Sequence, residues 1–431
     1  MNLSRISFLC AGLVAFASTA SAQNDVHVTG RYGTGIRPGL AVIPIGGPNG
    51  DSLRAILHRD LDHGDRLTML GANAEDLPLI VGVPTTAAYD ILSKMGAKYF
   101  VQGSLQPTGL HVAVYDVPTK AVVNAATFPL AATPLSPEWR LDVHRASDKI
   151  EEWTTGVPGI AATRIAFTRG GQIWMVDSDG ANLTAVEGTR GGRSPAWDPT
   201  TQYLAFSTEP GADAGGISIR DLWAGSTRRI TRSVGSGSFQ APTFSPDGKQ
   251  IAYGFGIDGI DVMIVDAKGG EPRNLTVGRK TLNTMPTFSR DGRQIAFTSG
   301  RLGPPDVYIA DADGTNARQL TNEGFDREKT YRSNPSWSPD GRQIAFQSDV
   351  NGRYQIVVTP PSGRGTQALT SDGENEDPHW APDSRHIVFS SSRGGGPKQL
   401  WILDTQSSRI RQLTRGAEVK NGAWSSPIPR R

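Results

Sequence analysis

The sequence predicts an α/β N-terminal domain followed by an all-β six-bladed β-propeller. Two observations lead to the propeller. An aromatic-centred motif recurs six times after residue 190, at spacings of 43 to 49 residues, and short strand-like apolar runs follow five of the six copies. A third observation separates the N-terminal part, because residues 23–160 lack this repeat and alternate strand-like with helical segments. Internal repeats of this length are typical of propellers and other repeat folds.

The repeated motif is Pro-x-aromatic, followed in two copies by Ser-Pro-Asp-Gly and in others by similar polar turn residues. Proline presets φ in such a turn, aspartate bonds back to the turn amides, and glycine accepts a positive φ. One such turn is common and proves little. Six copies in register predict a repeated unit; they centre on Trp197, Phe244, Phe288, Trp337, Trp380 and, without the proline, Trp424. We expect these aromatic side chains to pack between neighbouring blades.

Each unit carries three further strands. A second strand is expected at 165–167, 204–206, 251–253, 295–297, 344–346 and 387–389. A third strand is expected at 173–176, 217–219, 262–265, 307–309, 356–358 and 400–403. A short fourth strand should end on Leu-Thr or its equivalent: Leu183-Thr184, Ile230-Thr231, Leu275-Thr276, Leu320-Thr321, Leu369-Thr370 and Leu413-Thr414. Four short strands per period are typical of a propeller blade.

The two ends of the repeat region complete each other. The strand at 165–167 has no motif strand before it, and the motif strand around Trp424 has no second strand after it. Pairing them completes a sixth blade and closes the ring, which removes exposed sheet edges. The count of six blades follows from this pairing.

The N-terminal part reads as a compact α/β domain. A buried strand is expected at 40–43, a helix capped by Asp51 that extends to Leu61, and a second helix at 84–95. Strands should follow at 98–102, 110–115 and 121–128, and then a helix from Pro137 to about Trp153. The predicted domains are therefore 23–160 and 161–431, with an extended arm at 23–36.

Residues 1–22 resemble a secretory signal peptide. Arg5 gives a positive start, an apolar stretch follows, and Ala20-Ser21-Ala22 offers a cleavage site before Gln23. An uncleaved anchor is the alternative, although the apolar run is short for a membrane span. The single cysteine, Cys10, lies within this segment. A mature chain without cysteine suits an oxidising compartment and excludes thiol chemistry.

The composition and motifs argue against an enzyme or a nucleic-acid-binding protein. The net charge is only +2 and the charges are scattered. The chain has no Gly-x-Ser-x-Gly elbow, no His-Glu-x-x-His helix and no phosphate-binding loop. Asp177-Ser178-Asp179-Gly180 and its counterpart at 311–314 lack the carboxylates of a calcium loop, so we expect β-turns. We expect no cofactor and no metal, with a cation in the propeller channel as an open alternative.

The segment joining the two parts carries a family resemblance. It reads Trp139-Arg-Leu-Asp-Val-His144-Arg-Ala-Ser-Asp148, followed by Thr155-Gly156, Gly159 and Thr163-Arg-Ile-Ala-Phe167. This stretch and the strand at 38–44 resemble the TolB family, periplasmic propeller proteins of the Tol-Pal system. We expect His144 to make a hydrogen bond between the domains.

The resemblance implies a non-enzymatic scaffold in the periplasm, active in outer-membrane invagination during division and in envelope integrity. It implies that the lipoprotein Pal binds the propeller mouth, on loops that here hold Arg190, Arg193, Ser238, Phe239, Asn283, Thr284, Arg332, Asn334, Glu376, Asp377, Lys420 and Asn421. It also implies that the arm binds the inner-membrane protein TolA through its first residues, Gln23, Asn24, Asp25 and Val26. We expect a monomer. The alternative is an exported propeller with another ligand or with lyase or peptidase chemistry.

Overall fold

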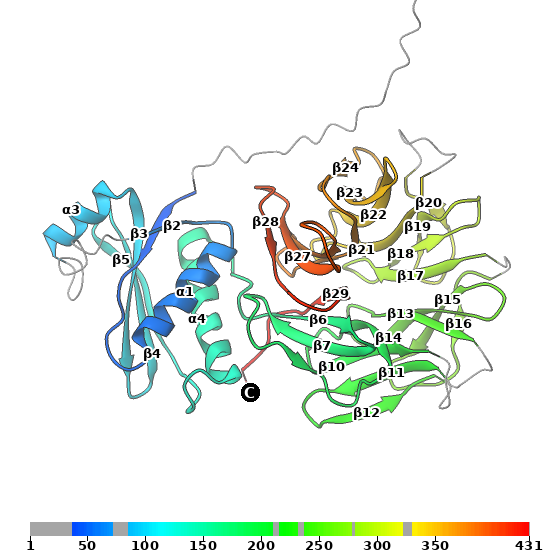
Figure 1. Cartoon of the computed structure of the whole chain (residues 1–431), viewed down its shortest axis with the longest axis horizontal. Coiled ribbons are helices and arrows are strands. Elements are labelled where there is room, and N and C mark those ends of the chain that lie inside the picture. Colours follow the sequence, from blue (N-terminus) through cyan, green and yellow to red (C-terminus); the bar gives the residue numbers. More distant parts are fainter. Residues whose placement is uncertain are drawn as a thin grey trace, which may run out of the picture.

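The computed structural model describes residues 37–71, 85–209, 215–231, 237–277, 281–321 and 330–430. A mixed α/β part lies beside a ring of six sheets, and the C-terminus lies between the two (Figure 1). The predicted signal peptide and the arm at 23–36 lie outside the described residues. The predicted division at residue 160 falls between the last helix and the first propeller strand, and it stays our proposal for the domain limits. Within the described ranges, no helix is both long and apolar enough to cross a membrane.

The N-terminal part is built on one five-stranded sheet, of order β2-β1-β3-β4-β5. The short strand β1 (Gly39–Val42), second from the edge, runs parallel to both β2 (Thr68–Leu70) and β3 (Ala97–Gln106). The strands β3, β4 (Gly109–Asp116) and β5 (Ala121–Phe128) form an antiparallel meander. Every predicted strand is present, whereas β2 was not predicted because three residues give too short a pattern.

Helices cover both faces of this sheet. The helices α1 (Gly50–His63) and α4 (Pro137–Thr155) share a core with Leu40 and Val42 of β1. The helix α3 (Thr86–Lys94) packs on the opposite face, against Ala41. The alternation follows because successive strand side chains point to opposite faces.

Two helix starts differ in detail from the sequence prediction. Asp51 does not cap α1. The cap residue is Asn49, in the left-handed region at φ 63° and without a capping side-chain bond, and Asp51 lies in the first turn. A carboxylate there is still favourable, because the amide end of a helix carries partial positive charge. The helix α3 is capped by Thr85, whose hydroxyl accepts from the Ala88 amide at 3.2 Å.

The propeller consists of six four-stranded sheets. The innermost strands are β9 (Gly192–Trp197), β13 (Ser238–Phe244), β17 (Asn283–Phe288), β21 (Arg332–Trp337), β25 (Asn375–Trp380) and β29 (Lys420–Trp424). The second strands are β6 (Arg164–Arg169), β10 (Tyr203–Thr208), β14 (Gln250–Gly256), β18 (Gln294–Ser299), β22 (Ile344–Val350) and β26 (His386–Ser391).

The outer half of each blade is formed by a full third strand and a short fourth one. The third strands are β7 (Gln172–Asp177), β11 (Gly216–Asp221), β15 (Asp261–Asp266), β19 (Asp306–Asp311), β23 (Arg353–Thr359) and β27 (Gln399–Asp404). The fourth strands are β8 (Thr184–Ala185), β12 (Ser226–Arg229), β16 (Arg273–Asn274), β20 (Arg318–Gln319), β24 (Gln367–Ala368) and β28 (Ile410–Gln412).

The ring closes as the sequence predicts. The last strand, β29, pairs antiparallel with the first propeller strand, β6, and sets Trp424 opposite Ile165. Both side chains belong to one buried cluster. The two ends of the repeat region are therefore held in a single sheet, and the prediction of six blades is confirmed.

The repeated Leu-Thr has a structural reason. The leucine is buried, as Leu320 is at 2 % exposure, and the threonine hydroxyl accepts from a backbone amide of the third strand, as Thr370 does from Ile356 at 2.9 Å. In the first blade the prediction of Leu183-Thr184 is wrong. There Val186 is the buried residue and Thr189 accepts from the Ile173 amide at 3.3 Å. Two residues separate Val186 from Thr189, whereas in the other blades the aliphatic residue and the threonine are adjacent.

Candidate partner-binding face and domain interface

The two ends of the propeller differ in what they contact. Each innermost strand starts at one end, which we call the mouth, and runs to a turn at the other end. The turns at that second end face the N-terminal part, since Asp383, in the turn after β25, lies 3.1 Å from Arg66. The mouth is therefore the end opposite the N-terminal domain.

A ring of six residues with left-handed backbone conformation lies where the innermost strands enter the channel. Their φ angles fall between 43° and 55°, and five of the six precede a proline: Ser194, Ala241, Met285, Asn334, Asp377 and Asn421. The strand register shifts around these positions, which makes each a β-bulge. Proline suits a bulge because it has no amide hydrogen to donate.

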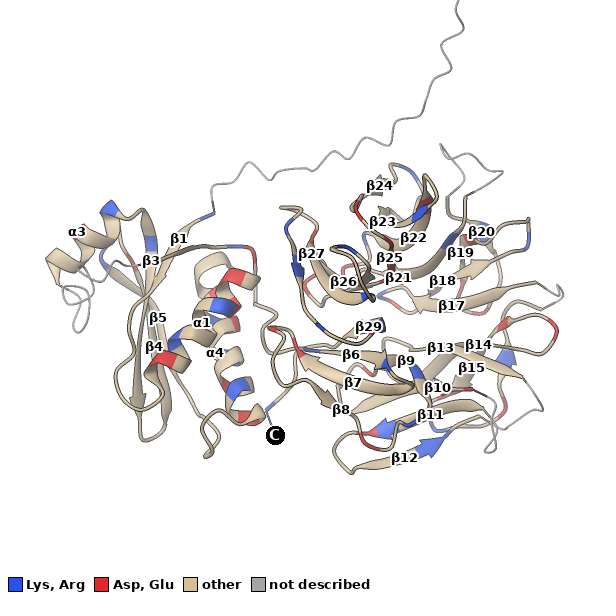
Figure 2. Ribbon diagram, in the orientation of Figure 1, with Lys and Arg blue, Asp and Glu red and all other residues tan. Residues whose placement is uncertain are grey.

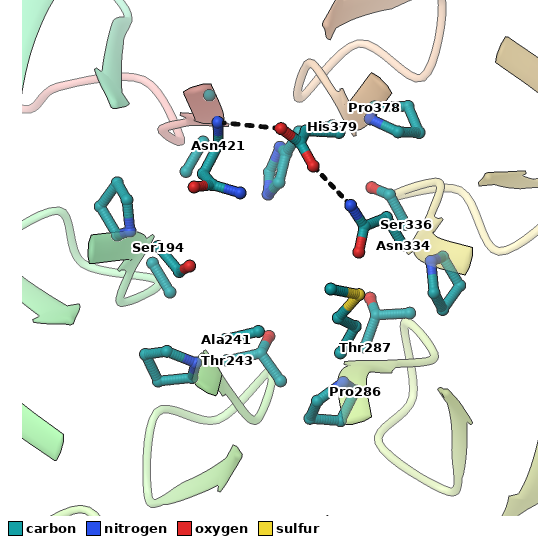
Figure 3. A pocket seen from close by; sticks show the side chains of 18 residues that line it. Ser194, Ala241, Thr243, Pro286, Thr287, Asn334, Ser336, Pro378, His379 and Asn421 are labelled. Atoms are coloured by element: carbon teal, nitrogen blue, oxygen red, sulfur yellow. Dashed lines mark hydrogen bonds between the residues drawn. The ribbon is translucent and has the colours of Figure 1, made fainter. Parts of the chain in front are cut away.

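The bulges turn these side chains towards the channel, where they line a cavity of about 140 Å³ (Figure 3). Three of the predicted mouth residues, Asn334, Asp377 and Asn421, are among them. The Asn334 side-chain amide and the Asn421 backbone amide, the latter at 3.2 Å, both donate to the Asp377 carboxylate. Burial, and then the charge of Glu376, raises the pKa of Asp377.

The histidine of the fifth motif, His379, also lines this channel. His379 Nδ1 accepts from the Trp424 amide at 3.2 Å, and burial lowers the pKa of His379. The imidazole is therefore neutral at neutral pH. The channel thus offers a polar wall of amides, one carboxyl and one neutral imidazole to a group that enters from the mouth.

The other predicted mouth residues differ widely in exposure. Arg190, Arg193 and Lys420 are exposed, and Ser238 and Glu376 are half-buried. Phe239, Asn283, Thr284 and Arg332 are buried, at 5 %, 1 %, 1 % and 2 % exposure. All twelve predicted residues lie on the innermost strands or just before them, at the mouth end. Their role in binding stays a prediction.

The buried members belong to a repeated polar network at the mouth. The Asn283 side chain donates to Asp261 at 3.2 Å, and Arg332 donates to Asp306 at 3.0 Å. Asp261 and Asp306 stand at the same position, the first residue of a third strand. These polar residues tie each innermost strand to the blade before it.

Sequence reasoning missed part of this network. In the next blade Asn375 donates to Gln355 at 2.8 Å, and neither residue was predicted. The available signal was positional, because Asn375 stands two residues before the bulge, as Asn283 and Arg332 do.

Ion pairs and hydrogen bonds join the two domains at the other end of the propeller. Arg385 binds Asp404 through two nitrogens, each at 2.7 Å, and donates a further bond to the Asp65 backbone carbonyl at 2.6 Å. Arg409 lies 2.6 Å from Asp62 and 3.1 Å from Asp65. Charged residues are spread along α1 and α4, the helices of the N-terminal part that lie nearest the propeller (Figure 2).

The prediction for His144 is wrong in its partner. Its Nδ1 lies 2.8 Å from Asp60, in the same domain, and its nearest carboxylate in the propeller, Asp177, is 3.9 Å from Nε2. Burial by itself would lower the pKa of His144, but Asp60, Asp179 and Asp177 outweigh burial and raise the pKa to about 9. His144 therefore carries charge at the interface, but it does not bridge the domains by a hydrogen bond.

Two groups at this interface have the residue types of a metal site: Asp60, His144 and Asp179, and Asp65, His386 and Asp404. Their carboxylates already have cationic partners in the protein. Arg140 lies 2.5 Å from Asp179, and Arg385 forms an ion pair with Asp404. We therefore interpret both groups as ion-paired parts of the interface. The expected β-turn is confirmed, since the Gly180 amide donates to the Asp177 carbonyl at 2.9 Å.

Comparison with known proteins agrees with this architecture. Residues 151–428 match the family model described as TolB beta propeller domain. The crystal structure of TolB from Acinetobacter baumannii superposes with a TM-score of 0.76 and 24 % identity, covering 91 % of this chain and 97 % of that one. At this identity the likeness shows the fold.

Two named relatives are similar in sequence. The Tol-Pal system protein TolB of Bordetella pertussis is 28 % identical over 321 residues, which cover 72 % of this chain and 70 % of that protein. The protein of the same name from Alcanivorax borkumensis is 26 % identical over 254 residues, and the match spans only 57 % of its length. These relatives are Tol-Pal system components, in agreement with the prediction of a non-enzymatic protein. The family match covers well over half of the chain, which therefore belongs to the TolB β-propeller family.

Proposed function

We propose that this protein is a periplasmic scaffold of the Tol-Pal system that binds the lipoprotein Pal at the propeller mouth. The observation that carries the proposal is the arrangement of the two ends. The N-terminal domain contacts the turn end through Arg66 and Asp383, so the mouth stays open to a partner. The family membership and the named relatives support a role in this system.

The mouth residues divide into two roles in this proposal. Exposed Arg193 and Lys420 contact Pal directly, and the channel ring around Asp377 receives a polar group of Pal. Asn283, Thr284 and Arg332 are buried and act by holding the loops in place. A rigid, preorganised surface costs less conformational entropy on binding than a mobile one.

The arm supplies the second partner. We assign TolA to its first residues, Gln23 to Val26. Arg37, the first described residue, lies 3.5 Å from Asp65, which Arg409 of the propeller also contacts. The arm therefore joins the domain beside the ion-paired interface. With one partner on each side, the protein links the two membranes as an exported monomer, in outer-membrane invagination during division and in envelope integrity.

The proposal is tested by calorimetry of residues 23–431 with Pal from the same organism. We expect saturable binding that the double substitution Arg193→Ala/Lys420→Ala weakens about tenfold, as removing two interface charges does. The matched control is Lys249→Ala/Arg293→Ala, which removes two exposed charges from the turn end. Absence of binding by the folded protein would contradict a Pal scaffold. Equal loss in both variants would contradict the placement at the mouth.

A further inference from the structure

Arginine residues of the fourth strands hold neighbouring blades together. At four junctions the arginine two residues before the buried aliphatic residue donates to a carbonyl in the outer turn of the next blade. The bonds are Arg228 to Ala267 at 2.6 Å, Arg273 to Asp313 at 2.9 Å, Arg318 to Pro361 at 2.7 Å and Arg411 to Ser178 at 3.1 Å. We call these bonds the blade clamps.

Two junctions lack the arginine. In the blade formed by β29 and β6 to β8, Thr184 stands at this position. There the hydroxyl of Thr227, on the neighbouring blade, donates to the Gly188 carbonyl at 3.1 Å and links the two blades instead. Gln367 has it in the blade formed by β21 to β24. At that second junction a groove of about 700 Å³ lies between the blades, lined by Gln367 on one side and by Thr405 and Gln406 on the other. Such a volume is typical of ligand sites.

The groove is lined mainly by neutral groups that form hydrogen bonds. Hydroxyls and amides come from Gln343, Thr359, Thr366, Gln367, Ser384, Thr405 and Gln406, and Val358, Leu369 and Trp380 contribute apolar surface. The only charged lining residues among those described are Asp340 and Arg342, whose side chains lie 3.8 Å apart and compensate each other. Gln343 and Gln406 are exposed, and their side-chain amides make no hydrogen bond to the described residues.

We propose that this groove binds a neutral saccharide. Paired hydroxyl and amide groups match the alternating donors and acceptors of sugar hydroxyls. An anionic or cationic ligand would need an uncompensated charge, which the groove does not supply. An extended peptide that adds to a sheet edge needs a longer free strand than β24, which has two residues.

The test is calorimetry of the whole mature protein with the neutral tetramer of N-acetylglucosamine as the probe. Saturable binding is expected. Gln343→Ala should weaken it about fivefold, the effect of one lost hydrogen bond. The matched control is Gln250→Ala, the same exposed turn position in another blade, which should leave the affinity unchanged.

Gln367→Arg is the stronger variant, because it restores the residue that clamps four other junctions and fills the groove. It should abolish saccharide binding while the thermal unfolding temperature stays equal or rises. The proposal is overturned if the native protein does not bind the tetramer, or if Gln367→Arg binds it unchanged. Binding of an uncharged Gly-Ser octapeptide in place of the saccharide would also overturn it.

Discussion

His386 of the propeller and Asp65 of the N-terminal domain meet across the domain interface, with Nε2 3.3 Å from the carboxylate Oδ2. The other ring nitrogen lies 2.8 Å from Asp383. Burial would lower the pKa of His386, but Asp383, Asp65 and Asp404 outweigh burial and raise it. The imidazole is fully buried and bridges two carboxylates, which favour its protonated form.

Removing this bridge should loosen the contact between the domains. We expect His386→Asn to lower the free energy of unfolding by about 3 kcal/mol, because two buried carboxylates lose a charged partner. Urea denaturation followed by fluorescence measures this. The control is His111→Asn, on the surface of β4, which should change stability by less than about 0.5 kcal/mol. Equal effects of the two substitutions would contradict a special role for His386.

Stability should fall as the pH rises from about 6.5 to 9, whereas below 6.5 His63 opposes the decline, because burial lowers its pKa to about 3. Burial raises the pKa of Asp148 to about 7 and of Glu151 to about 8, and the carboxylates around His144 raise its pKa to about 9. Each group keeps its proton in the folded protein at pH values where the unfolded chain has lost it, and linkage then makes stability decrease with pH. Each contribution is complete below the ordinary pKa of its group and is lost as the pH passes the raised value.

Urea denaturation at a series of pH values checks this prediction. The substitution His144→Gln should flatten the decline between pH 6.5 and 9 and leave the pH dependence below 6.5 in place. At the acid end the sign reverses. Burial would raise the pKa of Asp383, but His386 and Arg66 lower it to about 2, so its contribution disappears as the pH falls from about 4. Stability that rises from pH 6.5 to 9 would contradict this assignment.

Backbone strain in the ring of residues with left-handed conformation can be tested by one substitution to glycine. Ala241 has φ 43°, where an alanine costs about 1 kcal/mol relative to glycine. Ala241→Gly should therefore raise the free energy of unfolding by roughly 0.5–1 kcal/mol. Ala196, which also lines the channel, is not in the left-handed region, so Ala196→Gly should lower stability by a similar amount. Scanning calorimetry compares the two. Destabilisation by both would contradict strain at the ring.

The proposed arm is tested by deletion. A chain that begins at residue 27 lacks Gln23 to Val26 and should lose TolA binding while it keeps its affinity for Pal. The two partners are assigned to separate surfaces, so the losses should be independent. Surface plasmon resonance with each partner gives both affinities. Loss of Pal binding on deletion, or unchanged TolA binding, would contradict the assignment.

The sequence predicts the propeller well because its signals are local and repeated. The motif of Pro335 and Trp337 can be recognised from neighbouring residues alone, and its six copies fix where each blade begins. The mouth is harder to predict. In the sequence Asn283 and Arg332 resemble solvated loop residues. In the structure each is buried and hydrogen-bonded to an aspartate that lies 22 or 26 positions earlier in the chain. The interface is beyond local reasoning, since Asp65 and His386 are 321 positions apart.

Binding of Pal at the mouth can be mapped by hydrogen–deuterium exchange of the protein with and without Pal. We expect slower amide exchange in the mouth segments 190–194, 330–334, 374–377 and 417–421 when Pal is bound. The turns 245–249, 289–293 and 338–342 at the opposite end should exchange at the same rate. Protection confined to those turns, or no change anywhere at saturating Pal, would contradict it.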